Sequence, residues 1–181
     1  MSVFTNPATG AAEHATAYVR AILGLLGDRK PVDVLRETTL ALSRAIDGLS
    51  PSELRQPEAP GKWSIAQILQ HLADSEIVWA WRMRLILAQD RPVLTGYDQD
   101  LWAERLQYDQ ADVSDALEQF TVLRRGNLRL VERTPLADLK RVGIHSERGE
   151  ESLEHLQRLY AGHDLMHLQQ LARVRRAVAS S

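Results

Sequence analysis

The chain contains no cysteine among its 181 residues. This absence excludes disulfide bonds, a thiol nucleophile and every zinc site that is built on thiolates. Any metal or catalytic chemistry must therefore use histidine, carboxylate or hydroxyl side chains.

Long apolar runs and an excess of basic charge are also missing. No apolar stretch approaches the ~20 residues that a membrane-spanning helix requires. The formal net charge is −2 at pH 7, whereas nucleic-acid-binding domains present a basic face. Residues 1–10 have neither the basic segment nor the apolar segment of a secretory signal. We therefore expect no nucleic-acid partner, no membrane partner and a cytoplasmic location.

The motifs of several common helical sites are absent as well. No glutamate is followed three residues later by histidine, so the Glu-x-x-His pattern of di-iron carboxylate bundles is missing. The zinc-protease motif His-Glu-x-x-His fails because Asp164 follows His163. Glycine-rich phosphate loops are missing too.

Helical periodicity dominates what remains, and it predicts an all-α fold. We expect a flexible tail at 1–11 and a single domain at 12–181, with a long irregular connection over 90–111 and no strands. The connection lies between the second and third bundle helices, which favours a four-helix bundle with a crossover, plus an extra N-terminal helix. The predicted long helices span 12–26, 31–48, 64–88, 113–133 and 151–178, with short helices after Pro51 and near 100–106.

The helix that starts at Ser64 has the clearest start signal. Ser64 is followed three residues later by Gln67, which is the capping-box pattern. Trp63 and Ile68 flank this cap at the spacing of a hydrophobic staple. At the last helix, Glu150 and Glu151 favour an N-terminus through the helix dipole.

Two histidines, His163 and His167, lie four residues apart near the C-terminus. On a helix they share one face, at the centre of the apolar stripe of the last helix. A core histidine is usually satisfied by one protein hydrogen bond, but two such rings also make half of a metal site. His71 is the candidate for the third ligand. It lies on the flank of its own apolar stripe, where the alternative is a histidine at the boundary of the core.

Glu76 and Arg124 also fall on apolar stripes of their helices. We hypothesise that they form an ion pair inside the bundle. The alternative is that Arg124 buries only its stem and turns its guanidinium outward. Glu76 has a second alternative role, the orientation of a metal-ligating histidine.

Four stretches together resemble the DinB-like (DinB/YfiT-type) metal-binding four-helix bundles. This group includes thiol-dependent S-transferases and a mycothiol-dependent maleylpyruvate isomerase. The resemblance covers roughly residues 31–178. The stretches are GKWSIAQILQHLADSE at 61–76, YDQDLW at 97–102, GIH at 143–145 with Gly149, and AGHDLMHLQQ at 161–170.

The resemblance implies that His71 joins His163 and His167 to bind one divalent metal. Neutral imidazoles suit zinc, nickel, iron or copper, and zinc and nickel are the leading candidates. It also implies a homodimer, and it gives no substrate. His145 and Asp98 match the family pattern, and each has two interpretations: lining the mouth of the site or stabilising a turn.

A three-histidine site leaves coordination positions for water or substrate, as in catalytic sites. The sequence therefore favours a metal-dependent thiol S-transferase or hydrolase that acts on a small molecule or uses a thiol cofactor. The alternatives are a non-catalytic, metal-stabilised or metal-sensing dimeric bundle, and a plain bundle without metal.

Overall fold

The computed structural model describes residues 11–179, with side chains from residue 15 onward. The tail predicted at 1–11 lies outside the described residues except for Ala11, which begins the first helix. The elements are α1 (Ala11–Leu26), α2 (Pro31–Ile46), α3 (Pro51–Arg55), α4 (Ile65–Ala88), β1 (Val93–Leu94), α5 (Gln99–Arg105), η1 (Tyr108–Gln110), α6 (Val113–Arg133), η2 (Leu136–Lys140), β2 (Val142–His145), β3 (Gly149–Ser152) and α7 (Leu153–Val178).

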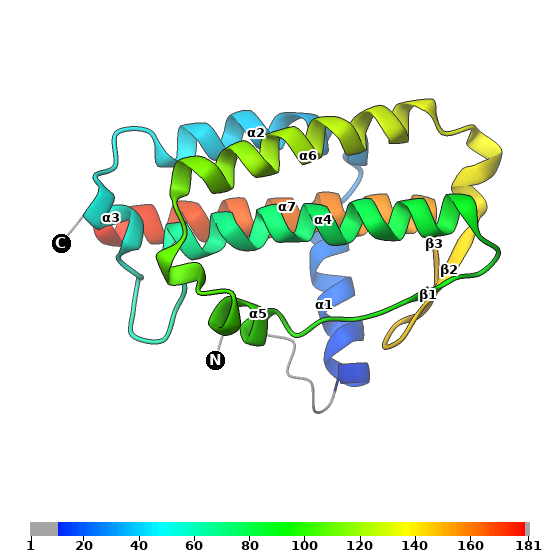
Figure 1. The fold of residues 1–181 in the computed structure, drawn as a ribbon, viewed down its shortest axis with the longest axis horizontal. Coiled ribbons are helices and arrows are strands. Elements are labelled where there is room, and N and C mark those ends of the chain that lie inside the picture. The colour runs from blue at the N-terminus through cyan, green and yellow to red at the C-terminus, as the bar shows by residue number, and fades with distance from the viewer. Residues whose placement is uncertain (1–10, 180–181) are drawn as a thin grey trace.

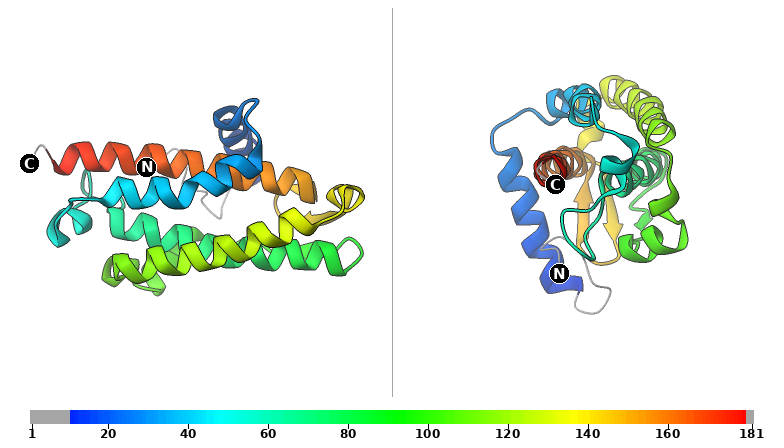
Figure 2. Two further views of the ribbon diagram at one scale, coloured as in Figure 1. Left: turned by 90° about the horizontal axis from the view of Figure 1, so that it is seen from above. Right: turned by 90° about the vertical axis from the view of Figure 1, so that its left-hand side faces the viewer.

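Helices α2, α4, α6 and α7 lie along the long axis and form a four-helix bundle (Figure 1). α4 and α6 are neighbours that run in the same direction, while α2 and α7 run in the opposite direction (Figures 1 and 2). Parallel neighbours require the chain to return to its starting end, which explains the long connection between α4 and α6. The predicted fold class is confirmed. None of the described helices has the length and hydropathy of a membrane span.

The start of α4 follows the predicted capping box. The Ser64 hydroxyl accepts a hydrogen bond from the Gln67 backbone N–H, and the Gln67 side-chain oxygen accepts one from the Ser64 backbone N–H at 2.9 Å. These bonds satisfy backbone donors that have no partner inside the helix. They set the position at which α4 begins, and with it the position of His71.

A small sheet is the main departure from the predicted fold. β1 pairs in parallel with β2, and β2 pairs in antiparallel with β3. The strands contain only two to four residues, too few for an alternating pattern to stand out. Glu150 and Glu151 belong to β3, and Ser152 caps α7, so the predicted dipole role of these glutamates is wrong.

The core of the bundle contains two large apolar clusters with a polar layer between them, and a third, small cluster lies where α1 packs on α7. One large cluster lies toward the sheet and includes Leu35 and Trp79; the other lies toward the opposite end and includes Leu42 and Leu72. Every bundle helix contributes buried polar groups to the region where the two clusters meet. These groups are Thr38 on α2, His71, Asp74, Ser75 and Glu76 on α4, Arg124 and Asn127 on α6, and Asp164 and His167 on α7.

Helix α1 lies across α7 on the outside of the bundle (Figures 1 and 2). Gly162 on α7 lies directly against α1, because a Cβ atom at this position would collide with the backbone carbonyl of Ile22. The absence of a side chain at Gly162 therefore allows α1 to pack on α7.

We expect Gly162→Ala to lower the free energy of unfolding by about 1–3 kcal/mol, as overpacking of a core does. Gly126→Ala is the matched control, because Gly126 also lies inside a helix but a Cβ there meets nothing within 4 Å. That variant should gain about 0.5–1 kcal/mol from the higher helix propensity of alanine. Urea unfolding of both variants measures the difference; equal effects would contradict the proposed steric role of Gly162.

Candidate metal centre

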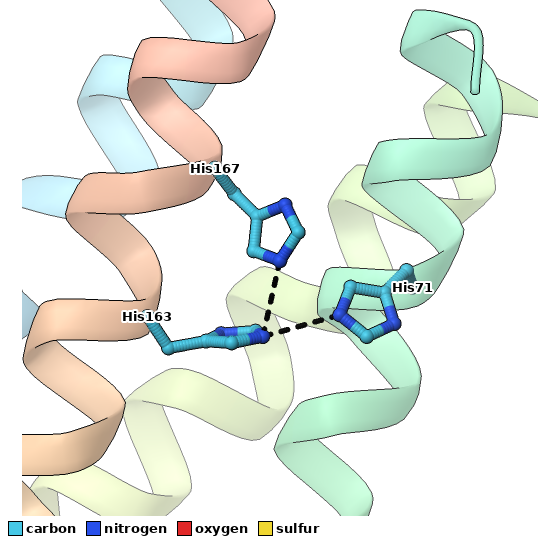
Figure 3. A group of neighbouring side chains, drawn as sticks. All are labelled: His71, His163 and His167. Atoms are coloured by element: carbon cyan, nitrogen blue, oxygen red, sulfur yellow. Dashed lines mark hydrogen bonds between the residues drawn. The ribbon is translucent and has the colours of Figure 1, made fainter. Parts of the chain in front are cut away.

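Three histidine rings from α4 and α7 point toward one another in the polar layer (Figure 3). The Nε2 atom of His163 lies 3.1 Å from Nε2 of His71 and 3.1 Å from Nε2 of His167. One nitrogen from each ring can be chosen so that all three lie within 4.8 Å of one another. The structure thus brings together the three residues that the sequence and the family resemblance singled out, including His71.

The donor set fits a divalent metal better than it fits hydrogen bonding among the rings. Two nitrogens bound to one zinc ion at about 2.0–2.1 Å in tetrahedral geometry lie about 3.3 Å apart. A single ring nitrogen carries either one proton or one lone pair, so Nε2 of His163 cannot bond to both neighbours at once. In addition, Nδ1 of His163 is buried and has no hydrogen-bond partner among the described residues.

Burial keeps the three rings neutral. It lowers the pKa of His71 and of His163 well below 6.5, and the neighbouring rings lower both further. Burial also lowers the pKa of His167 to about 4, against an opposing hydrogen bond to Gln170. Neutral imidazoles are the form that binds a metal, so the site is prepared for a cation at neutral pH.

Neighbouring side chains hold the rings of His167 and His71 in place. Nδ1 of His167 lies 2.8 Å from the side-chain oxygen of Gln170. Since this oxygen only accepts, Nδ1 carries the proton and Nε2 presents its lone pair to the cluster. The indole of Trp63 packs against His71, with ring centroids 5.1 Å apart.

A buried ion network lies next to the histidines. Arg124 bonds to Glu76 at 2.7 Å and to Asp164 at 2.6 Å, and its side chain is 2% exposed. The hypothesised pair is therefore confirmed, and the outward orientation of Arg124 is wrong. The Glu76 carboxylate bonds to Arg124 and Asn127, which argues against the alternative that it orients a histidine. Asp164, the second carboxylate that bonds to Arg124, was not predicted from the sequence.

A pocket of about 90 Å³ opens beside the cluster, and His163 forms part of its wall. His145 and Asp98 each had two interpretations, lining the mouth of the site or stabilising a turn. His145 lines this pocket. Asp98 does not; its carboxylate accepts from the backbone N–H groups of Asp100 and Leu101 and thereby caps α5. The other pocket residues include Tyr18, Ser75, Arg82, Tyr97, Glu147, Arg148 and Tyr160.

His145 is neutral for a local reason. Its Nδ1 faces the backbone N–H of Glu147 at 3.1 Å, and its Nε2 faces the Arg82 guanidinium at 3.2 Å. A protonated ring would direct a hydrogen at each of these donors. Burial, followed by the charges of Arg148 and Arg82, lowers the pKa of His145 to about 3.

A family model for the DinB superfamily matches residues 35–171. The chain belongs to the DinB superfamily. Among its superfamily relatives is a Bacillus subtilis (strain 168) protein named "Putative metal-dependent hydrolase YfiT", 28% identical over 84% of this chain and 86% of YfiT. A Bacillus cereus (strain 03BB102) protein named as a hydrolase of the same kind is 29% identical over 75% of this chain and 78% of its own.

The DinB superfamily assignment agrees with a solved structure. YfiT from B. subtilis superposes with a TM-score of 0.72 at 28% identity, covering 79% of this chain and 84% of YfiT. Its structure is described as having "an unusual four-helix bundle topology". The parallel arrangement of α4 and α6 gives this DinB superfamily member a topology that differs from a simple up-and-down bundle.

The low histidine pKa values predict how acid affects the metal-free protein. In the unfolded chain each histidine titrates near pH 6.5, whereas His167 in the folded chain titrates at about 4. The unfolded state therefore binds more protons, and stability that is complete above pH 6.5 is lost as the pH falls toward 4. Between pH 7.5 and 5.5 we expect a loss of about 1 kcal/mol per buried histidine.

Urea unfolding of chelator-treated protein at these two pH values measures the loss. His167→Gln should reduce the pH dependence by the share of one histidine. Identical unfolding free energies at pH 7.5 and pH 5.5 would contradict the buried, neutral state of the rings.

Proposed function

We propose that this protein is a metal-dependent hydrolase whose divalent metal is held by His71, His163 and His167. The observation that carries this proposal is the dual position of His163, which belongs both to the histidine cluster and to the wall of the pocket. A purely structural metal site is closed by its ligands. A pocket that reaches one ligand favours a site at which a small molecule meets the metal.

Three neutral histidines leave at least one coordination position for water or substrate. A bound divalent metal supplies a Lewis acid and lowers the pKa of a bound water or thiol toward neutrality. Histidine nitrogens suit zinc and nickel, and both are candidates. The names of the relatives support hydrolysis as the reaction of this site.

Hydroxyl groups beside the cluster are placed to donate hydrogen bonds to a bound substrate. The Ser75 hydroxyl lies 3.5 Å from Nε2 of His71 and 3.2 Å from the Tyr97 hydroxyl. Burial raises the pKa of Tyr97, so its phenol stays protonated at neutral pH. Such donors stabilise negative charge that develops on a substrate oxygen.

The test begins with elemental analysis of protein purified without a histidine tag or added metal. Hydrolysis of small ester and amide substrates is then measured before chelation, after chelation, and after addition of zinc or nickel. We expect about one metal ion per chain, loss of hydrolysis on chelation and recovery with one of the two metals.

A second arm supplies a small thiol and an electrophile. Consumption of the thiol in place of water would assign thiol S-transfer, which the family resemblance also implies. A protein that holds metal stoichiometrically but is inactive in both arms would support the non-catalytic alternative.

The homodimer implied by the family resemblance remains a prediction. Light scattering on size-exclusion fractions at micromolar concentration measures the molar mass, and a monomeric mass would contradict it.

A further inference from the structure

The side chains of Arg82, Arg124 and Arg148 are largely buried, and two of them are paired with carboxylates. Arg124 pairs with Glu76 and Asp164, and Arg148 pairs with Glu151 at 2.6 Å. Arg82 is only 6% exposed. Within the described part of the chain, no carboxylate oxygen lies within 4.0 Å of the Arg82 guanidinium nitrogens. A guanidinium without a counter-ion is an unfavourable arrangement in a protein interior.

The contacts of Arg82 satisfy some of its hydrogen-bond donors but not its charge. One terminal nitrogen donates to the Thr95 carbonyl at 2.7 Å and lies 3.2 Å from Nε2 of His145. Its Nε atom is buried and has no acceptor among the described residues. Both contact groups are neutral, so the positive charge remains available to a ligand.

Arg82 lies on the wall of the pocket that also contains His163. Helix α1, the connection after β1 and the β2–β3 hairpin all lie on this side of the bundle (Figure 1). Three phenols share the pocket, and burial raises the pKa of each, so that all three remain O–H donors at neutral pH. They are Tyr18, Tyr97 and Tyr160.

Two carboxylates limit how much negative charge the pocket accepts. Glu151 offsets the positive charge of Arg148, which lines the pocket. Glu147 also lines the pocket, with its carboxylate packed against Gly96. One unpaired guanidinium beside an acidic side chain matches a singly charged group better than a doubly charged phosphate. A pocket of about 90 Å³ admits a small organic group, because one water needs only about 10–15 Å³ of such volume.

We propose that the substrate carries a carboxylate group, which binds to Arg82 and the surrounding phenols while the rest of the molecule extends to the histidine cluster. This proposal rests on the proposed function, since it places the substrate of the metal site. Arg82 thereby acts in substrate specificity: it selects small carboxylates over neutral molecules of the same shape.

The experiment compares propionate with propionamide, which have the same shape but differ in charge. Calorimetric titration of the zinc-loaded protein should show propionate binding at least about tenfold more tightly, the size of effect expected for hydrogen bonds to charged groups. Arg82→Gln should remove this preference and leave the zinc content unchanged, because Arg82 contacts none of the three histidines.

Two further variants keep the result interpretable. Arg82→Lys retains a charge and should retain part of the preference, even if Arg82→Gln disturbs folding. Arg129→Gln removes the same charge from an exposed position on α6 and should leave the preference intact. Equal affinity for the two probes in the unsubstituted protein, or a preference that survives in Arg82→Gln, overturns the carboxylate site; survival would indicate direct coordination to zinc.

The carboxylate site and the proposed function fail in different ways. A protein that binds no zinc or nickel but retains Arg82-dependent propionate binding keeps the carboxylate site and disproves the metal-dependent function. A protein with metal-dependent hydrolysis but no preference for propionate keeps that function and disproves the carboxylate site.

Discussion

Arg124→Ala is expected to destabilise the fold by at least about 3–5 kcal/mol, the usual cost of removing one partner of a buried ion pair. The cost arises because two carboxylates, those of Glu76 and Asp164, lose their shared counter-ion in the centre of the bundle. Each is only 1% exposed, so water cannot replace the guanidinium. This loss is a large share of the ~5–15 kcal/mol by which domains are stable.

Other contacts of Arg124 add to the effect. Its NH1 atom donates to the backbone carbonyl of Leu35 at 2.9 Å, and its guanidinium lies 4.5 Å from the ring centroid of Phe120. Removal of Arg124 therefore takes away an additional hydrogen bond to a carbonyl on α2 and leaves a cavity between the two apolar clusters. Each of these changes is destabilising in its own right.

Urea unfolding followed by circular dichroism measures the effect. Arg125→Ala is the matched control, since Arg125 is the exposed neighbour on the same helix and surface changes stay within about ±0.5 kcal/mol. A triple variant, Glu76→Leu with Arg124→Met and Asp164→Leu, should recover much of the stability because it leaves no unpaired charge. Unchanged unfolding in Arg124→Ala would show that the buried network contributes nothing.

The sequence was sufficient to predict most of the fold because the helices carry strong local signals. The start of α4 at Ser64 rests on side chains that lie within three residues of one another. The crossover followed from the length of the connection between α4 and α6. β1 and β2, by contrast, are joined across about fifty residues of chain, and a pairing over that distance leaves no pattern in either strand alone.

The site shows the same limit. His163 and His167 lie on one helix, so their spacing placed both on one face. His71 comes from another helix and lay on the flank of its stripe, so the family pattern was needed to select it. The inward position of Asp164 could have been predicted from the sequence. Asp164 lies four residues after Tyr160 and seven before Leu171, and these three buried residues share one face of α7. Arg82 gave no such signal, because a missing counter-ion becomes visible only in three dimensions.

The second large effect is expected at His163. His163→Ala should lower the affinity for zinc or nickel by more than about 100-fold. Changes to residues that merely orient a ligand already cost about 10–100-fold, and His163 is the ring whose Nε2 lies 3.1 Å from both of the others. The variant should fold, because Nδ1 of His163 has no partner to lose among the described residues.

Two histidines serve as matched controls. His155 lies on the same helix, half-exposed and eight residues earlier, and His155→Ala should leave the affinity unchanged. His145→Ala tests the pocket itself: His145 lines the pocket but is not part of the cluster, so the metal should stay while ligand binding changes. Competition with a chelating dye gives the affinities, and thermal melts confirm folding.

The pattern across these variants separates the alternatives. If only the variants of His71, His163 and His167 lose affinity for the metal, the metal binds at the three-histidine cluster. If His163→Ala retained full affinity, the rings would have to be satisfied by protein groups alone. Nε2 of His163 cannot bond to both of its neighbours at once, so one contact in the cluster would then remain unsatisfied. The metal-bound state is the arrangement in which all three nitrogens have a partner.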